Sequence, residues 1–92
     1  MEKEIGRILN YFARVGVAVC EITEDRLEKG DTIRISGRRT ELYQTVASLE
    51  VDHRPVPSAG RGVKVGLKVN ARVRPNDRVY KFSDDSEDLN RI

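Results

Sequence analysis

The sequence has very few of the side chains from which metal sites and nucleophilic active sites are built. Cys20 is the only cysteine and His53 the only histidine, which excludes an internal disulfide and a zinc site built from cysteines and histidines. No Gly-x-x-x-x-Gly-Lys-Ser/Thr sequence is present, and Gly60-Arg61-Gly62 is too short to hold nucleotide phosphates. We therefore expect no enzymatic activity, no nucleotide hydrolysis by this chain, no metal and no cofactor.

Long apolar stretches are also absent. The chain opens with the charged residues Glu2, Lys3 and Glu4, and no apolar run approaches the roughly 20 residues that a membrane-spanning helix needs. We expect neither a signal peptide nor a transmembrane helix. Because a single cysteine is compatible with a reducing compartment, we predict a cytoplasmic location without a membrane partner.

Charge is abundant, mixed in sign and unevenly distributed. Charged residues make up 35% of the 92 residues and hydrophobic ones 38%, which is typical of a folded domain. Four of the 15 acidic residues but only one of the 17 basic residues lie in 83–92, which leaves residues 1–82 with a net charge of +5. We therefore predict one basic β-barrel domain, residues 1–82, and a flexible acidic C-terminal tail, residues 83–92.

Alternation of apolar and polar residues dominates the first 82 positions. In 63–69 valine or leucine fills every odd position, whereas Lys64, Gly66 and Lys68 fill the even ones, as in a half-buried strand. In 15–20 valines alternate with small residues, which suit a tightly packed barrel interior or a close neighbouring strand. With glycine and proline marking the turns, the pattern predicts strands at residues 4–11, 16–23, 32–36, 41–51, 63–69 and 79–82.

These strands predict an all-β fold, a small closed antiparallel β-barrel of about six strands with Greek-key connections. Closure of the barrel removes the exposed strand edges that a short sheet would otherwise present. Residues 24–27 are compatible with a helical turn, and the proline-containing stretch 53–62 is expected to be a loop.

The order of turns and strands resembles domain 2 of translation elongation and initiation GTPases of the Tu type, here as a stand-alone domain. Leu27-Glu28-Lys29-Gly30-Asp31-Thr32-Ile33 is similar to a strand-entry segment of that domain, and Val65-Gly66-Leu67 to a later strand. The resemblance covers roughly residues 5–82 and implies the accessory barrel without its GTPase domain. In the family this surface meets the acceptor end of aminoacyl-tRNA, although the family's asparagine before Val-Gly is Lys64 here.

The leading functional hypothesis is a non-catalytic, translation-factor-like binding module that contacts RNA or the ribosome. Its partner would be tRNA, ribosomal RNA or a translation-related protein, bound through a basic face. An ordinary charged surface with interspersed ion pairs is the competing interpretation. The basic residues that could form this face include Arg38, Arg39 and Arg54. The candidate nucleic-acid-binding residues are Arg61, Lys64, Lys68, Arg72 and Arg74.

The alternative hypothesis is a protein-interaction module that docks onto a separate enzyme or GTPase. The chain also resembles the C-terminal barrel of some collagenase-like peptidases, where that barrel is accessory. Association with a stable protein partner that survives nuclease treatment would favour this alternative.

Two isolated residues have a chemical and a structural interpretation. Cys20 lies among the small residues of a predicted strand, which favours a buried, inert thiol over a reactive one. His53 lies in a predicted loop next to Asp52 and has no neighbouring nucleophile in sequence, which favours a surface histidine over a general base.

Overall fold

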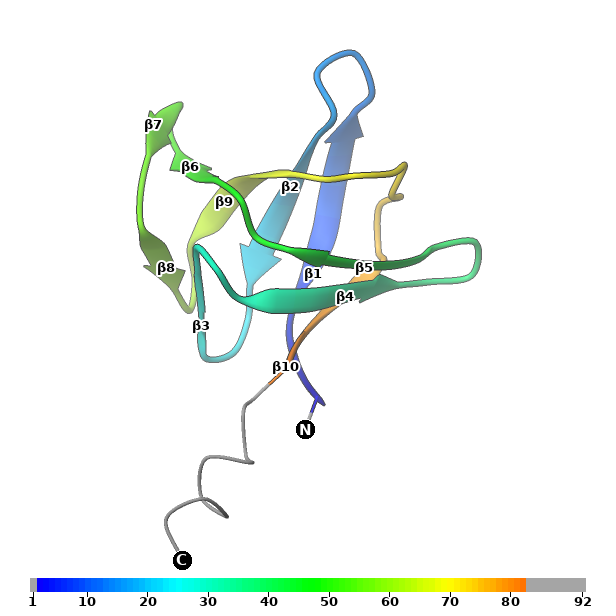
Figure 1. Ribbon diagram of the computed structural model, residues 1–92, viewed down its shortest axis with the longest axis horizontal. Helices are drawn as coiled ribbons and strands as arrows, with labels where there is room; N and C mark the ends of the chain where they lie inside the picture. Colours follow the sequence, from blue (N-terminus) through cyan, green and yellow to red (C-terminus); the bar gives the residue numbers. More distant parts are fainter. Residues whose placement is uncertain (1, 83–92) are drawn as a thin grey trace, which may run out of the picture.

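The computed structural model describes residues 2–82, so the predicted tail at 83–92 lies outside the described residues. Within 2–82 the chain forms ten β-strands and no helix, and every strand pairing is antiparallel (Figure 1), which confirms the predicted all-β, antiparallel class. The strands are β1 (Glu2–Phe12), β2 (Val17–Ile22), β3 (Arg26–Glu28), β4 (Thr32–Ser36), β5 (Glu41–Thr45), β6 (Leu49–Val51), β7 (Arg54–Pro55), β8 (Ser58–Gly60), β9 (Lys64–Lys68) and β10 (Arg78–Phe82).

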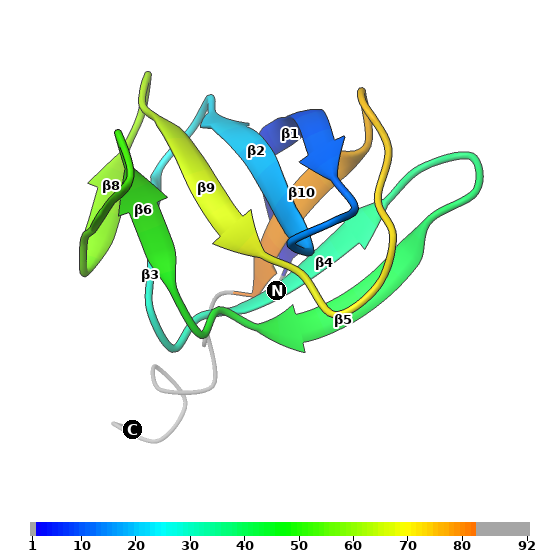
Figure 2. The ribbon, with the colours of Figure 1, turned by 90° about the horizontal axis from the view of Figure 1, so that it is seen from above.

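The prediction of a closed barrel is wrong. Eight strands form one open sheet in the order β5-β4-β10-β1-β2-β9-β6-β7, and β3 and β8 form a separate two-stranded sheet. The large sheet is strongly curled, as the view from above shows (Figure 2). Its hydrogen-bonded ladder nevertheless has two ends, β5 and β7, which no described backbone pairing joins.

A closed barrel would need a backbone ladder between β5 and the end of β9. The side chain of Gln44 bridges this region instead. Gln44 on β5 is 7% exposed; its Nε2 donates to the carbonyl oxygen of Lys68 at 2.9 Å. Its Oε1 accepts from the backbone N–H of Asn70 at 2.8 Å. One amide group therefore satisfies a donor and an acceptor that a ladder between neighbouring strands would otherwise pair.

The predicted alternation places the core correctly. Val65 and Leu67 are buried on β9 while Lys64 and Lys68 are exposed. On β2 the small residues face inward, which is one of the two environments expected for them, and the neighbouring valines are only half-buried. The interior is one continuous apolar cluster formed by Ile5, Ile8, Ala18, Cys20, Ile22, Leu27, Ile33, Ile35, Val46, Leu49, Ala59, Val65, Leu67, Val69, Val73 and Val79.

Several short elements differ from the prediction. The expected strand at 41–51 is divided into β5 and β6, because residues 46–48 leave the ladder and carry the chain to the other end of the sheet. The expected helical turn at 24–27 is wrong: Asp25 has a φ of 59°, and β3 begins at the next residue. The expected loop at 53–62 contains the short strands β7 and β8.

Candidate functional site

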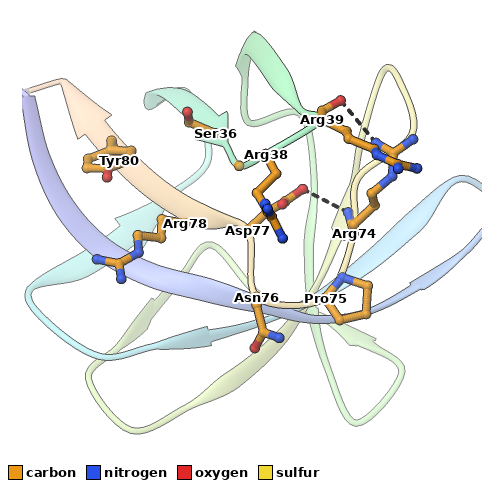
Figure 3. A pocket seen from close by; sticks show the side chains of 10 residues that line it. Ser36, Arg38, Arg39, Arg74, Pro75, Asn76, Asp77, Arg78 and Tyr80 are labelled. Carbon is orange, nitrogen blue, oxygen red and sulfur yellow. Dashed lines mark hydrogen bonds between the residues drawn. The ribbon is translucent and has the colours of Figure 1, made fainter.

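An open groove lies at one end of the β4–β5 hairpin. It has a volume of about 930 Å³. Its walls are residues 36–39 of the hairpin, residues 74–77 before β10, and Arg78 and Tyr80 of β10 (Figure 3). Four arginines are among these residues, so we call it the arginine groove: Arg38, Arg39, Arg74 and Arg78.

The turn that forms one wall is held rigidly by Asp77. This residue is 4% exposed; its Oδ2 accepts from the backbone N–H of Arg74 at 2.8 Å. Asn76 adopts a left-handed φ of 75°, which asparagine tolerates. Backbone hydrogen bonds of 2.8 Å in both directions then join Asn76 and Asp77 to Ile8 of β1. The wall is therefore attached to the main sheet.

The hairpin wall requires glycine at position 37. A Cβ atom on Gly37 would overlap Oδ1 of Asp77. By contrast, Gly66 on β9 leaves ordinary contact distances of 3.6 Å or more around a Cβ atom. The close packing thus lies at the arginine groove, between the hairpin and the turn, and not on β9.

Arg74 connects the two walls. Its Nη1 donates to the carbonyl oxygen of Arg39 at 3.1 Å (Figure 3). The same nitrogen donates to the hydroxyl oxygen of Thr40 at 3.3 Å. A guanidinium group carries five N–H donors, so Nη1 uses only part of this capacity. The side chain therefore fixes the shape of the groove and also contributes its positive charge.

The electrostatic balance of the groove is strongly positive. Asp77 is its only acidic residue, against four arginines. Arg38 and Arg39 are exposed at the tip of the hairpin, and Arg78 forms an exposed ion pair of 3.3 Å with Glu4 of β1. Exposed pairs of this kind are weak, so Arg78 remains able to exchange Glu4 for another anion.

The five predicted nucleic-acid-binding residues do not all lie in this groove. Only Arg74 is part of it. Arg61 follows β8, Arg72 lies in the loop after β9, and Lys64 and Lys68 occupy the two ends of β9, with Nζ of Lys68 donating to the carbonyl oxygen of Val15 at 3.2 Å. The assignment of these five residues to nucleic acid stays a prediction.

Arg38 and Arg39 belong to the wider basic face expected from the sequence but not to the five candidate residues, and Arg78 belongs to neither set. Arg38 and Arg39 follow Gly37 in the hairpin turn, and the sequence shows this pair of consecutive arginines at a glycine turn directly. Arg78 carries no comparable signal, because its position beside the hairpin depends on the pairing of β10 with β4.

A second feature lies on the outer surface of β5, β4 and β10, and we call it the aromatic face. Tyr43, Arg34 and Tyr80 occupy directly paired positions across these three strands. Arg34 lies 5.1 Å from the ring centroid of Tyr80, and Tyr43 stacks on Phe82 with 6.1 Å between ring centroids. Tyr43 is 58% exposed and Phe82 39%, so the stacked pair presents apolar area to solvent.

Ion pairs fix Arg34 at the centre of the aromatic face. Its Nη1 lies 2.6 Å from Oε1 of Glu2, and its Nε lies 2.7 Å from Oε2 of Glu41. The hydrogen bond from Arg34 lowers the pKa of Glu41, and the same bond raises the pKa of Arg34. Arg34 is thereby held in one orientation over Tyr80.

The residues with possible catalytic chemistry are dispersed. Cys20 is buried, as predicted, and burial raises the pKa of its thiol to about 12. His53 is exposed at the β6–β7 turn with a φ of 65°, which agrees with the predicted surface position. Within 2–82, no three side chains among His, Cys, Asp and Glu are grouped to hold a metal ion. The same residues include no helix of the length and apolar character needed to span a membrane.

Comparison with known proteins relates the chain to peptidases. It is 44% identical over 78 residues to an uncharacterized protease of Methanocaldococcus jannaschii, and 35% identical over 79 residues to a collagenase of Porphyromonas gingivalis. These matches cover 84% and 85% of the chain. The chain spans about a fifth of the length of these curated relatives, at 19% and 22%. No family model matches the chain.

Solved structures with the same fold point in the same direction. The C-terminal domain of a proposed U32 peptidase from Geobacillus thermoleovorans has a TM-score of 0.81 at 18% identity. The match covers 88% of this chain and 93% of that one. The selenomethionine variant of the same domain gives a TM-score of 0.79, covering 84% and 96%. At this identity the comparison shows a shared fold.

These findings correct three predictions from the sequence. The resemblance to domain 2 of translation GTPases is wrong, because the relatives are named protease and collagenase and the structural neighbours are peptidase C-terminal domains. The RNA-binding, translation-factor role inferred from it is contradicted by the same relatives. So is the expectation that the chain is not an enzyme, since the relatives bear the names of enzymes.

The error has a physical origin. The segment from Leu27 to Ile33 supplies a tight turn and the start of an alternating strand. Any small curled antiparallel sheet needs such a turn and such alternation. Features of this kind therefore report the fold class more reliably than they report one family within it.

Proposed function

We propose that this chain is a protease-associated domain that docks onto the peptidase portion of a protein of its relatives' type. One combined observation supports the proposal. The chain matches about a fifth of proteins named protease and collagenase, and its fold is that of the C-terminal domain of a proposed U32 peptidase. About four-fifths of each relative lies outside the matched length and would provide the surface for docking.

The aromatic face is the surface best suited to this contact. Tyrosine and arginine are enriched among the residues that dominate binding energy at protein interfaces. Tyr43 and Phe82 offer exposed apolar area, and Arg34 is held in place beside them by Glu2 and Glu41. An interface formed on side chains that are already ordered loses less conformational entropy when it forms.

Docking can be measured by titrating this chain against the Methanocaldococcus protease lacking its matched segment, with calorimetric detection. We expect saturable binding that nuclease does not affect. The double substitution Tyr43→Ser and Phe82→Ser should weaken binding by about tenfold or more, because it removes the aromatic anchors.

Phe12 provides the matched control. It is 48% exposed on the β1–β2 hairpin and lies outside the aromatic face, so Phe12→Ser should leave the affinity nearly unchanged. Absence of binding would contradict the proposal that the domain docks. Equal weakening by Phe12→Ser and by the double substitution would contradict the choice of surface.

We also propose that the domain resides in the cytoplasm. A buried, unpaired Cys20 requires no oxidising compartment for stability, which supports a reducing, cytoplasmic environment for the domain. Cell fractionation of the native protein would test this.

A further inference from the structure

We propose that the arginine groove binds an acidic segment of polypeptide, through carboxylates that are paired with its guanidinium groups. This site goes beyond the docking role and does not require it, because the hairpin arginines lie outside the aromatic face. The ligand class follows from the charge, the shape and the aromatic content of the groove.

The positive charge of the arginine groove indicates an anionic ligand. Four arginines line the groove from two separate stretches of chain, the hairpin at 36–39 and residues 74–78, and the side chain of Arg78 extends away from those of Arg39 and Arg74 (Figure 3). Asp77 is the single carboxylate among the lining residues and offsets one of the four positive charges, and Glu4 pairs with Arg78 from outside the groove. Guanidinium groups form planar, paired hydrogen bonds with carboxylates and phosphates, and both are therefore candidate partners.

Shape favours an extended ligand over a small anion. The groove is open and has a volume of about 930 Å³, far more than one carboxylate or phosphate fills. The arginines are distributed along it, which suits several negative charges in succession. Its walls are also held in advance by the contacts of Arg74 with Arg39 and Thr40, and by those of Asp77 with Arg74.

The scarcity of aromatic residues in the groove favours polypeptide over single-stranded nucleic acid as the ligand. Sites for single-stranded nucleic acid normally provide exposed aromatic rings on which bases stack. Tyr80 is the only aromatic residue in the groove, and Arg34 lies over its ring at 5.1 Å. With no open stacking surface, the groove favours the carboxylates of glutamate and aspartate side chains.

The test uses the full chain and a fluorescein-labelled peptide of about ten glutamates, with fluorescence anisotropy as the measurement. We expect saturable binding that weakens as salt rises from about 50 to 300 mM, because the paired charges are partly exposed. The double substitution R38E and R39E should weaken binding by about tenfold or more, because it reverses two charges at the groove.

A matched control separates the groove from overall charge. K64E and K68E change the net charge by the same amount on β9, outside the groove, and should alter the affinity by no more than about threefold. Circular dichroism of both variants should match the original chain, since all four side chains are exposed. Equal weakening by the two double variants would overturn the proposal.

Two more arms complete the design. A single-stranded RNA of about ten uridines tests the other class of anion, and tighter groove-dependent binding of this RNA than of the peptide would overturn the proposal. Repeating the peptide titration with the Tyr43→Ser and Phe82→Ser variant should give unchanged affinity, so failure of docking and failure of the groove are distinguishable. Absence of peptide binding at the lowest salt would also overturn it.

Discussion

At the scale of single residues, Cys20 connects packing with chemistry. The thiol lies in the apolar core beside Gly6, where a Cβ atom would come within 3.2 Å of its Sγ. Desolvation by burial raises the pKa of the thiol from 9.0 to about 12, because the thiolate cannot be solvated there. The same burial makes the thiol inert, since the thiolate is the reactive form.

This raised pKa predicts a loss of stability at alkaline pH. The stability that this difference in pKa contributes to the folded state is fully present below the ordinary pKa of 9.0. It is lost as pH rises towards about 12, because only the unfolded chain ionises its thiol in that interval. Between pH 7 and pH 10 the original chain should therefore lose about 1.4 kcal/mol more unfolding free energy than a Cys20→Ala variant. Urea denaturation of both proteins at the two pH values measures the difference.

Each protein is compared with itself at the two pH values, so the Cys20→Ala variant at neutral pH is the reference for the same variant at pH 10. It also loses packing, but that loss is nearly independent of pH and cancels when the two pH values are compared. The same change in unfolding free energy in both proteins would show that Cys20 does not titrate differently in the folded and unfolded states.

At the scale of elements, Gln44 replaces a missing strand pairing. Its amide is the only described side-chain bridge between β5 and the segment at 68–70, and both of its polar ends are used. Gln44→Leu should destabilise the fold by about 1–3 kcal/mol, because it leaves the carbonyl oxygen of Lys68 and the N–H of Asn70 without this partner. Denaturant unfolding gives the loss, and hydrogen exchange at Asn70 should become faster.

Gln44→Glu provides a graded comparison. The carboxylate retains an acceptor for the N–H of Asn70 but has no N–H for the carbonyl oxygen of Lys68. Exchange at Asn70 should therefore stay slower in this variant than in Gln44→Leu. If the N–H of Asn70 exchanges at the same rate in both variants, the side-chain amide of Gln44 does not act as a bridge.

The same region shows what sequence could and could not predict about the elements. Residues 32–36 and 63–69 were placed correctly, because their alternation is strict and each strand has one buried face. The division of 41–51 was missed, although buried positions fall on even numbers up to Val46 and on an odd number at Leu49. That change of parity marks the point where the strand leaves the ladder.

At the scale of the whole molecule, the candidate site was only partly predictable. Glycine and proline in the sequence indicate the turns at 36–39 and 75–77 separately. Their convergence depends on β10 lying between β4 and β1, a pairing of residues more than 40 positions apart. Alternation within one strand contains no information about which distant strand lies beside it, so the predicted basic set followed β9 instead.

The large sheet and the two-stranded sheet share one hydrophobic core. Leu27 of β3 and Ala59 of β8 belong to the same apolar cluster as Leu67 of β9, although β3 and β8 share no ladder with the large sheet. A small sheet that buries its apolar residues in a common core cannot separate without exposing that core. We therefore expect residues 2–82 to unfold in a single cooperative transition.

Two matched truncations test this cooperativity. Leu27→Ala in the small sheet and Leu67→Ala in the large sheet both remove a fully buried leucine, so each should cost about 2–5 kcal/mol. For a domain of this size that corresponds to a fall in Tm of about 10–30 °C. Thermal scans by far-ultraviolet circular dichroism and by tyrosine fluorescence should give coincident midpoints in both variants. Val15→Ala, at a 55% exposed position, should shift the midpoint little. If Leu27→Ala instead produced a separate early transition, β3 and β8 would be an independent unit, and a common core would no longer explain how the two sheets are held together.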